Sequence, residues 1–292
     1  GLAYGRAGDQ RNRGPAAAAR LGAVAAAVRS LTHALDDVPH TGNTGFPPDV
    51  TPIPAIALST RAAEILAEAL AAEPDLKLTI TTHCRTLPDA PSHNVIGELR
   101  GTEFPDEVIL VGGHLDSWDV APGAHDDGAG VVQSIEVLRL FRTLGLKPRH
   151  TLRCVLFTNE ENGLRGATAY ATQAKAAGEK HVFAVETDTG GFAPRGFTLG
   201  STQGDAHERA ARWRPLLEPY GLHVFAKGGG GADVTPLLLQ GTTVSNLVPD
   251  SQRYFDYHHT TADGISAVNK RELELGAAAL AALIYLVDTH GL

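Results

Sequence analysis

From residue 94 onward, short apolar runs typical of buried strands alternate with segments of helical periodicity. Strands are expected at 94–99, 108–111, 152–157, 182–185 and 244–247, and helices at 130–144, 167–177, 206–220 and 273–287. Such alternation predicts βαβ units, whose right-handed crossovers build a largely parallel sheet covered on both faces. The predicted fold class is therefore α/β, with a mostly parallel central sheet flanked by helices over residues 93–292.

The first 92 residues follow a different pattern and are expected to form a smaller domain. Apolar side chains at helical spacing predict one helix over 15–35, and a long loop follows that contains 39–43. A short strand is expected at 53–56, a helix capped by Ser59 and Thr60 runs to about Ala72, and alternation predicts a half-buried strand at 76–82. This segment contains no cluster of metal-ligating side chains.

Charge and apolar content argue against two classes of partner. The formal net charge is −8 and no dense Lys/Arg cluster compensates for it, so we expect no nucleic-acid surface. No apolar run reaches the roughly 18 residues that span a bilayer, so we expect no membrane segment. The two cysteines cannot define a disulfide framework, and Cys154, in an apolar strand pattern, is expected to be a buried thiol.

Acids and histidines stand in the segments that follow the predicted strands. They are His114, Asp116 and Asp126 after 108–111, Glu160 and Glu161 after 152–157, Asp188 after 182–185, and His259 farther along. Each alone has an ordinary explanation: a Glu pair is usually a solvated surface, a His pair a surface loop, and Asp-Asp-Gly a turn. These ordinary explanations do not account for the joint occurrence of the motifs at successive strand ends. Those ends meet at one edge of a parallel sheet, so the side chains would lie close together.

This ligand set suits zinc, which readily binds imidazole nitrogen and carboxylate oxygen. One metal ion would need only three or four such ligands. Five ligands, with a carboxylate able to bridge, favour two ions roughly 3.5–4 Å apart.

Five motifs resemble those of the di-zinc exopeptidases, a family that includes bacterial leucyl aminopeptidases and glutamate carboxypeptidases. They are Gly-Gly-His-Leu-Asp-Ser-Trp-Asp at 112–119, Gly-Ala-His-Asp-Asp-Gly at 123–128, Asn-Glu-Glu-Asn-Gly at 159–163, Glu-Thr-Asp at 186–188 and His-His-Thr-Thr-Ala-Asp at 258–263. The loops at 39–42 and 228–233 are also similar to those of one subgroup. The resemblance implies a phosphorylase/hydrolase-like α/β fold, two zinc ions per chain, and hydrolysis of dipeptides or short peptides.

The resemblance also implies a role for each side chain. His114 and Asp188 would bind one zinc ion, Glu161 and His259 the other, and Asp126 would bridge them. Asp116 would accept a hydrogen bond from the free nitrogen of His114, which fixes the tautomer of that ring. Glu160 would be the general base, and the peptide bond between Asp126 and Asp127 would be cis, with Asp127 shaping the turn.

Three further residues are candidates for contacts with substrate. His258 stands where related carboxypeptidases have a Tyr that stabilises the oxyanion. Asp233 ends the glycine-rich stretch 228–233, which lacks the Lys-Ser/Thr of a phosphate loop, and could face a free amino group of the substrate. Arg253 is the nearest candidate partner for a substrate carboxylate.

Two other functions use the same fold. A glutaminyl-cyclase-like acyltransferase would bind one zinc ion, and a catalytically inactive binding module, as in the transferrin receptor, would lack the metal set. Residues 1–92 resemble a truncated protease-associated insert. We expect a processed or truncated N-terminus because the sequence contains no methionine and residues 1–20 do not resemble a signal peptide. The resemblance implies a secreted or periplasmic enzyme and is compatible with a homodimer.

Overall fold

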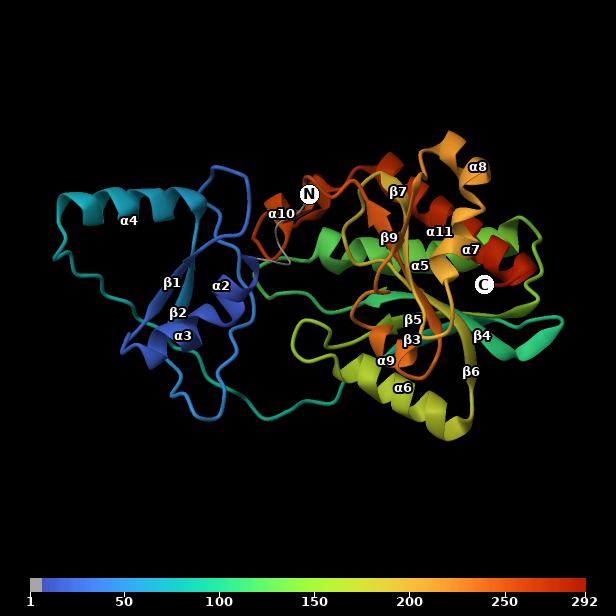
Figure 1. Ribbon diagram of the computed structural model, residues 1–292, viewed down its shortest axis with the longest axis horizontal. Coiled ribbons are helices and arrows are strands. Elements are labelled where there is room, and N and C mark those ends of the chain that lie inside the picture. Colours follow the sequence, from blue (N-terminus) through green and yellow to red (C-terminus); the bar gives the residue numbers. More distant parts are fainter. Residues whose placement is uncertain (1–6) are drawn as a thin grey trace. The chain divides into compact units, whose positions relative to one another are not determined.

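The computed structural model describes residues 7–292, which belong to two compact units (Figure 1). One unit comprises the chain up to Pro91 together with Phe255–Ala262. The other comprises Ser92–Tyr254 and Asp263–Leu292 and contains the large sheet. The resemblance of residues 1–92 to a protease-associated insert stays a prediction.

The first unit is built from short elements. Its helices are α2 (Asp9–Asn12), α3 (Gly14–Arg20) and α4 (Thr60–Ala72), and α10 (Tyr254–Tyr257) leads into its second segment. Two parallel strands, β1 (Ala26–Arg29) and β2 (Ala55–Leu58), pair along their whole length. The predicted helix cap is confirmed, because Ser59 Oγ accepts a hydrogen bond of 2.9 Å from Ala62 N at the start of α4.

Two predictions for this unit are wrong. The single helix over 15–35 ends at Arg20, because Gly22 has a left-handed backbone with φ of +89° and residues 26–29 pair with β2 instead. Leu21 and Val24, two apolar positions of that pattern, are 90% and 85% exposed. The strand at 76–82 does not form; the segment has no regular secondary structure, and Leu78 is 57% exposed.

The second unit contains a seven-stranded mixed sheet of order β3-β5-β4-β6-β9-β7-β8. Its strands are β3 (Val95–Leu99), β4 (Phe104–His114), β5 (His150–Phe157), β6 (Lys180–Glu186), β7 (Pro194–Gly200), β8 (Val224–Lys227) and β9 (Thr243–Pro249). The four strands β5-β4-β6-β9 are parallel, and β3 and β7 pair with them antiparallel. The mostly parallel α/β sheet is confirmed, although β7, which begins with proline, and the four-residue β8 were missed.

Helices cover both faces of this sheet (Figure 1). On one face lie α5 (Ala129–Thr143), α7 (Ala206–Ala211) and α11 (Lys270–His290); on the other lie α6 (Arg165–Ala177) and α9 (Thr235–Leu238). Each face of the sheet packs into its own hydrophobic core. Along β4, Ile109 and Val111 point into the core on the α5 face, and Val108 and Leu110 into the core on the α6 face, as the two-residue period of a strand requires.

The helix predicted over 206–220 is broken. It divides into α7, α8 (Arg214–Leu217) and η2 (Glu218–Tyr220). Pro215 and Pro219 stand at the starts of the last two pieces, where a missing backbone N–H costs least.

Among the helices of residues 7–292, α11 alone is long and apolar enough to cross a membrane by length and composition. In this unit Leu280, Leu283 and Ile284 are almost fully buried in the core on the α5 face of the sheet. The helix is therefore used here as a core element. Cys154 is also buried, as predicted.

A histidine under the sheet makes stability depend on pH. The His181 side chain is buried. The Tyr170 hydroxyl accepts from Arg153 Nη1 at 2.8 Å, so it donates its own proton to His181 Nε2 at 2.7 Å. Burial and then the charge of Arg153 lower the pKa of His181 to about 4. Between about pH 4 and 6.5 the unfolded chain binds the extra proton, so this contribution is complete above that window and is lost as the pH falls through it.

We therefore expect His181 to account for about 2 kcal/mol of the stability lost between pH 7 and pH 5. Urea denaturation in the presence of a chelator, at both pH values, measures this loss in the wild type and in His181→Gln. The variant keeps an acceptor for Tyr170 but does not titrate. Equal pH dependence in the two proteins would contradict the assignment.

Candidate metal centre

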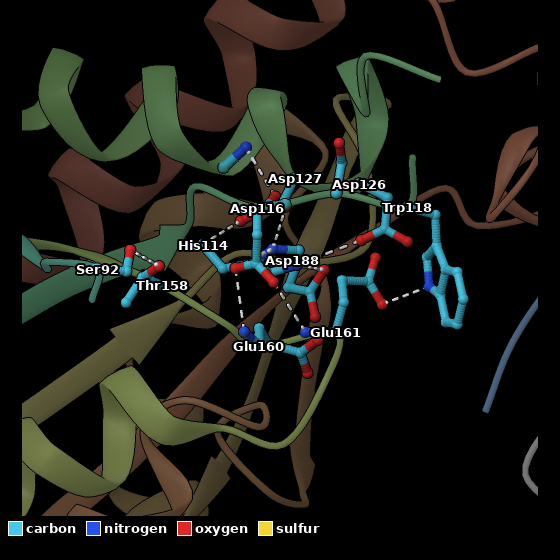
Figure 2. Close-up of polar contacts among 12 residues, drawn as sticks. Ser92, His114, Asp116, Trp118, Asp126, Asp127, Thr158, Glu160, Glu161 and Asp188 are labelled. Carbon is cyan, nitrogen blue, oxygen red and sulfur yellow. Dashed lines mark hydrogen bonds and ion pairs between the residues drawn. The ribbon is translucent and has the colours of Figure 1, made fainter. Parts of the chain in front are cut away.

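Three neighbouring parallel strands bring most of the predicted ligands together. Strand β4 lies between β5 and β6, so their carboxyl ends meet at one edge of the sheet. His114 ends β4, Glu160 and Glu161 follow β5, and Asp188 follows β6 (Figure 2). Close packing at this edge requires glycine at 113, where a Cβ would lie 2.3 Å from the Asp127 carboxylate.

His114 lies at the centre of the cluster, and its side chain is fully buried. Its Nδ1 lies 2.8 Å from the backbone carbonyl of Asp116, which can only accept, so Nδ1 carries the proton. In the neutral ring Nε2 then presents a lone pair. That atom faces Asp126 Oδ1 at 3.3 Å and Asp188 Oδ1 at 3.5 Å (Figure 2).

This geometry corrects the expected role of Asp116. The carboxylate of Asp116 is 3.8 Å from His114 Nδ1, and the main-chain carbonyl orients the ring instead. The carboxylate accepts hydrogen bonds from the backbone N–H groups of Glu160 and Glu161, at 3.0 and 3.2 Å. Asp116 therefore positions residues at two strand ends. Its main-chain carbonyl orients His114 at the end of β4, and its carboxylate holds the backbone of the two glutamates that follow β5.

A turn before α5 presents Asp126. The peptide bond between Asp126 and Asp127 is cis, as the resemblance implied. The carboxylate of Asp263 accepts hydrogen bonds from His125 N at 2.7 Å and Asp126 N at 3.0 Å. The Asp127 carboxylate accepts from His114 N and from Gly130 N, both at 3.0 Å, and ties the end of β4 to the first turn of α5.

Glu161 is oriented by a residue for which the motif had suggested no role. Trp118 Nε1 donates a hydrogen bond of 2.8 Å to Glu161 Oε2 (Figure 2). His114, Asp126 and Glu161 each offer a ligand atom, and these atoms all lie within 4.8 Å of one another. The same is true of His114, Asp127 and Asp188, although hydrogen bonds already engage both oxygens of Asp127.

The cluster carries more buried negative charge than its protein cations balance. Burial first, and then the charge of Asp188, raise the pKa of Glu160 to about 8. Burial also raises the pKa of Asp188 to about 6, against the effect of His114. Burial lowers the pKa of His114, but Asp126 and Asp188 outweigh it and raise that pKa above its usual range.

These donors fit a divalent cation. A buried imidazole lone pair and two carboxylate oxygens point at one another, and three acceptors cannot satisfy each other without a proton or a cation between them. His114 Nε2 and Asp188 Oδ1 accordingly make no hydrogen bond within residues 7–292. Nitrogen and carboxylate oxygen together form a donor set that zinc accepts.

The candidate substrate residues lie in different surroundings. Asp233 is 1% exposed, neither of its carboxylate oxygens has a hydrogen bond within the described chain, and burial raises its pKa to about 7. Arg253 pairs with Glu272 at 2.7 Å and lies over the Phe192 ring at 4.7 Å.

His258 and His259 belong to the first unit, where their rings stack 3.5 Å apart. Their roles toward substrate or metal stay predictions.

Known proteins resemble this chain over most of its length. Carboxypeptidase Q of Bos taurus is 33% identical over 284 residues, which cover 97% of this chain and 60% of that protein. This chain thus spans about 60% of the length of the carboxypeptidase Q sequences that it matches.

Solved structures show the same architecture. A peptidase M28 precursor from Shewanella amazonensis has a TM-score of 0.83 and 34% identity, over 98% of this chain and 64% of that one. A zinc aminopeptidase from Bacillus subtilis has a TM-score of 0.62 at 21% identity, over 91% of this chain and 64% of that one, which shows the shared fold alone. Residues 94–284 match the model of peptidase family M28, and the chain belongs to that family.

Proposed function

We propose that this protein is a zinc-dependent exopeptidase that hydrolyses dipeptides or short peptides and releases the N-terminal residue. The observation that supports this most directly is the buried lone pair of His114 Nε2, which faces the carboxylates of Asp126 and Asp188 at 3.3 and 3.5 Å. Within the protein only a second proton on the His114 ring would resolve this juxtaposition of acceptors, whereas a zinc ion would resolve it with the ring neutral.

We assign the ligands as the resemblance implies. His114 and Asp188 would bind one zinc ion, Glu161 and His259 a second, and Asp126 would bridge the two. Zinc supplies a bound water of lowered pKa and polarises the scissile carbonyl. Trp118 holds Glu161 in place, and the Asp116 carbonyl holds His114. These two side chains therefore need little reorganisation to bind zinc.

Glu160 is the group that moves the proton. It directly precedes Glu161, and the Asp116 carboxylate holds the backbone N–H groups of both residues, so one neighbour can face the metal and the other the water. Burial raises the pKa of Glu160 to about 8 before any cation is bound, and nearby positive charge favours its ionised form. The carboxylate accepts a proton from the attacking water and then delivers it to the nitrogen of the leaving amine.

A dipeptide library with free and blocked termini tests this function. We expect release of the N-terminal residue from substrates with a free amino group, loss of activity after chelation, and recovery on adding zinc. N-acetylated and C-amidated versions of the same dipeptides are the matched controls for end preference. Hydrolysis that is insensitive to the chelator would exclude the metal-dependent reaction.

A further inference from the structure

His259 has an unusual backbone conformation. Its φ is +58°, in the left-handed region that residues other than glycine rarely adopt. Such a conformation is strained and persists only where neighbouring groups impose it. Those neighbours are found within the first unit, in the loop that contains His40 and Thr41.

Thr41 holds the main chain of His259 from a sequence distance of 218 residues. Thr41 N donates a hydrogen bond of 3.0 Å to the His259 carbonyl, and the Thr41 hydroxyl donates to the same oxygen at 3.3 Å. The loop is itself anchored, because His40 N donates to Ser30 Oγ at 2.8 Å and Ser30 Oγ donates to the Leu58 carbonyl at 2.7 Å. Thr41 is therefore fixed to the end of β2.

Thr41 also determines which nitrogen of the His259 ring carries the proton. The Thr41 carbonyl lies 3.3 Å from His259 Nδ1 and can only accept, so Nδ1–H donates and Nε2 keeps its lone pair. His258 stacks on the same ring at 3.5 Å and 20°, and Phe255 packs edge-on against His258. The ring is thus held both at Nδ1 and across one face.

The same arrangement occurs at the other candidate histidine ligand. His114 Nδ1 donates to a main-chain carbonyl, that of Asp116, and its Nε2 faces the carboxylates. A metal-ligating histidine ordinarily donates its second nitrogen to a carbonyl or carboxylate, which fixes the tautomer and raises the basicity of the ligand atom. His259 meets that requirement through Thr41.

We propose that Thr41 is a positioning residue for zinc binding: its N–H and hydroxyl impose the His259 backbone, and its carbonyl selects the tautomer with Nε2 available as a ligand. This inference rests on the proposed function. The loop at 39–42, singled out in the sequence without a role, thereby becomes part of the support of the metal centre.

Zinc titration by calorimetry, with metal counts after dialysis, tests the proposal on the full chain. Thr41→Val removes the hydroxyl alone and should weaken the second zinc site about 2- to 10-fold. Thr41→Pro also removes the N–H and should weaken it roughly 10- to 100-fold. Thr44→Val is the matched control in the same loop; its hydroxyl faces Arg11 O at 3.5 Å, and affinity should not change.

Nitrogen-15 NMR of the metal-free protein tests the tautomer directly, with His259→Gln to assign the signal. We expect the Nδ1–H form in wild type and in Thr41→Val. The NMR measurement does not use Thr41→Pro, so it tests the proposal even where that variant fails to fold. An Nε2–H tautomer, or Thr41→Val binding zinc as tightly as Thr44→Val, would overturn the inference. A wild-type chain that binds no zinc would instead overturn the proposed function.

Discussion

Replacing Glu160 with glutamine is expected to lower kcat by a factor of roughly 10² to 10⁴ while the zinc content stays unchanged. The amide matches the carboxylate in size and can still accept a hydrogen bond, but it cannot take a proton from the attacking water. The loss corresponds to about 3–5 kcal/mol of activation free energy. Steady-state kinetics on the best dipeptide, with metal analysis of the same samples, gives both quantities.

The neighbouring residue is the sharpest comparison. Glu161→Gln removes a proposed ligand, so zinc should be lost together with activity, whereas Glu160→Gln should separate the two. Glu208→Gln, on the exposed side of α7, controls for the general effect of removing a carboxylate. A kcat for Glu160→Gln within a factor of two of wild type, at full zinc content, would show that the proton is carried elsewhere.

The edge of the sheet at which the candidate ligands meet could be predicted because its signals are local. An apolar run long enough for a buried strand, followed at once by His114 or Asp188, places that side chain at a carboxyl end without knowledge of the partner strand. The parallel order β5-β4-β6 then brings the three ends together. An unbroken apolar run sufficed there because each strand is covered on both faces.

The spacing of apolar residues was misleading where burial is slight. The 15–35 segment has helical spacing of apolar residues, but Leu21 and Val24 are exposed, and a glycine in the left-handed region ends the helix. In the 76–82 segment no neighbouring strand lies beside the alternating residues, which are mostly exposed. Spacing alone does not show whether a packing partner exists.

The contacts that orient the candidate ligands could not be read from spacing. Asp263 supports Asp126 across 137 residues of sequence, and Trp118 reaches Glu161 across 43. Asp116 was placed beside His114 correctly, but with the wrong group, because a motif identifies a residue and leaves open whether its main chain or its side chain makes the contact. Such choices depend on the turn geometry.

Replacing Asp126 with asparagine is expected to reduce bound zinc from two ions per chain to fewer than one, because a bridging carboxylate serves both sites. Asp188→Asn should leave one ion bound, since it is assigned to a single site. Asp119→Asn, an exposed acid of the same motif, is the control and should keep both. Metal analysis after dialysis compares the wild type with the three variants. If the wild type binds one zinc ion and Asp188→Asn still binds one, the result would favour the single-zinc acyltransferase.

Thermal unfolding separates loss of metal from general damage to the fold. In this cluster Asp126→Asn is expected to change stability in opposite directions without and with zinc. Without zinc, Asp126→Asn removes one charge from a group of buried carboxylates whose pKa values burial and mutual repulsion already raise, so the variant should be no less stable than wild type. With zinc a thousandfold above Kd, each occupied site adds about 4 kcal/mol of stability. The zinc-dependent rise in Tm should therefore be largest in wild type, smaller in Asp188→Asn and smallest in Asp126→Asn. A variant destabilised equally with and without zinc would point to a structural role for Asp126, since loss of a ligand acts only when the metal is present.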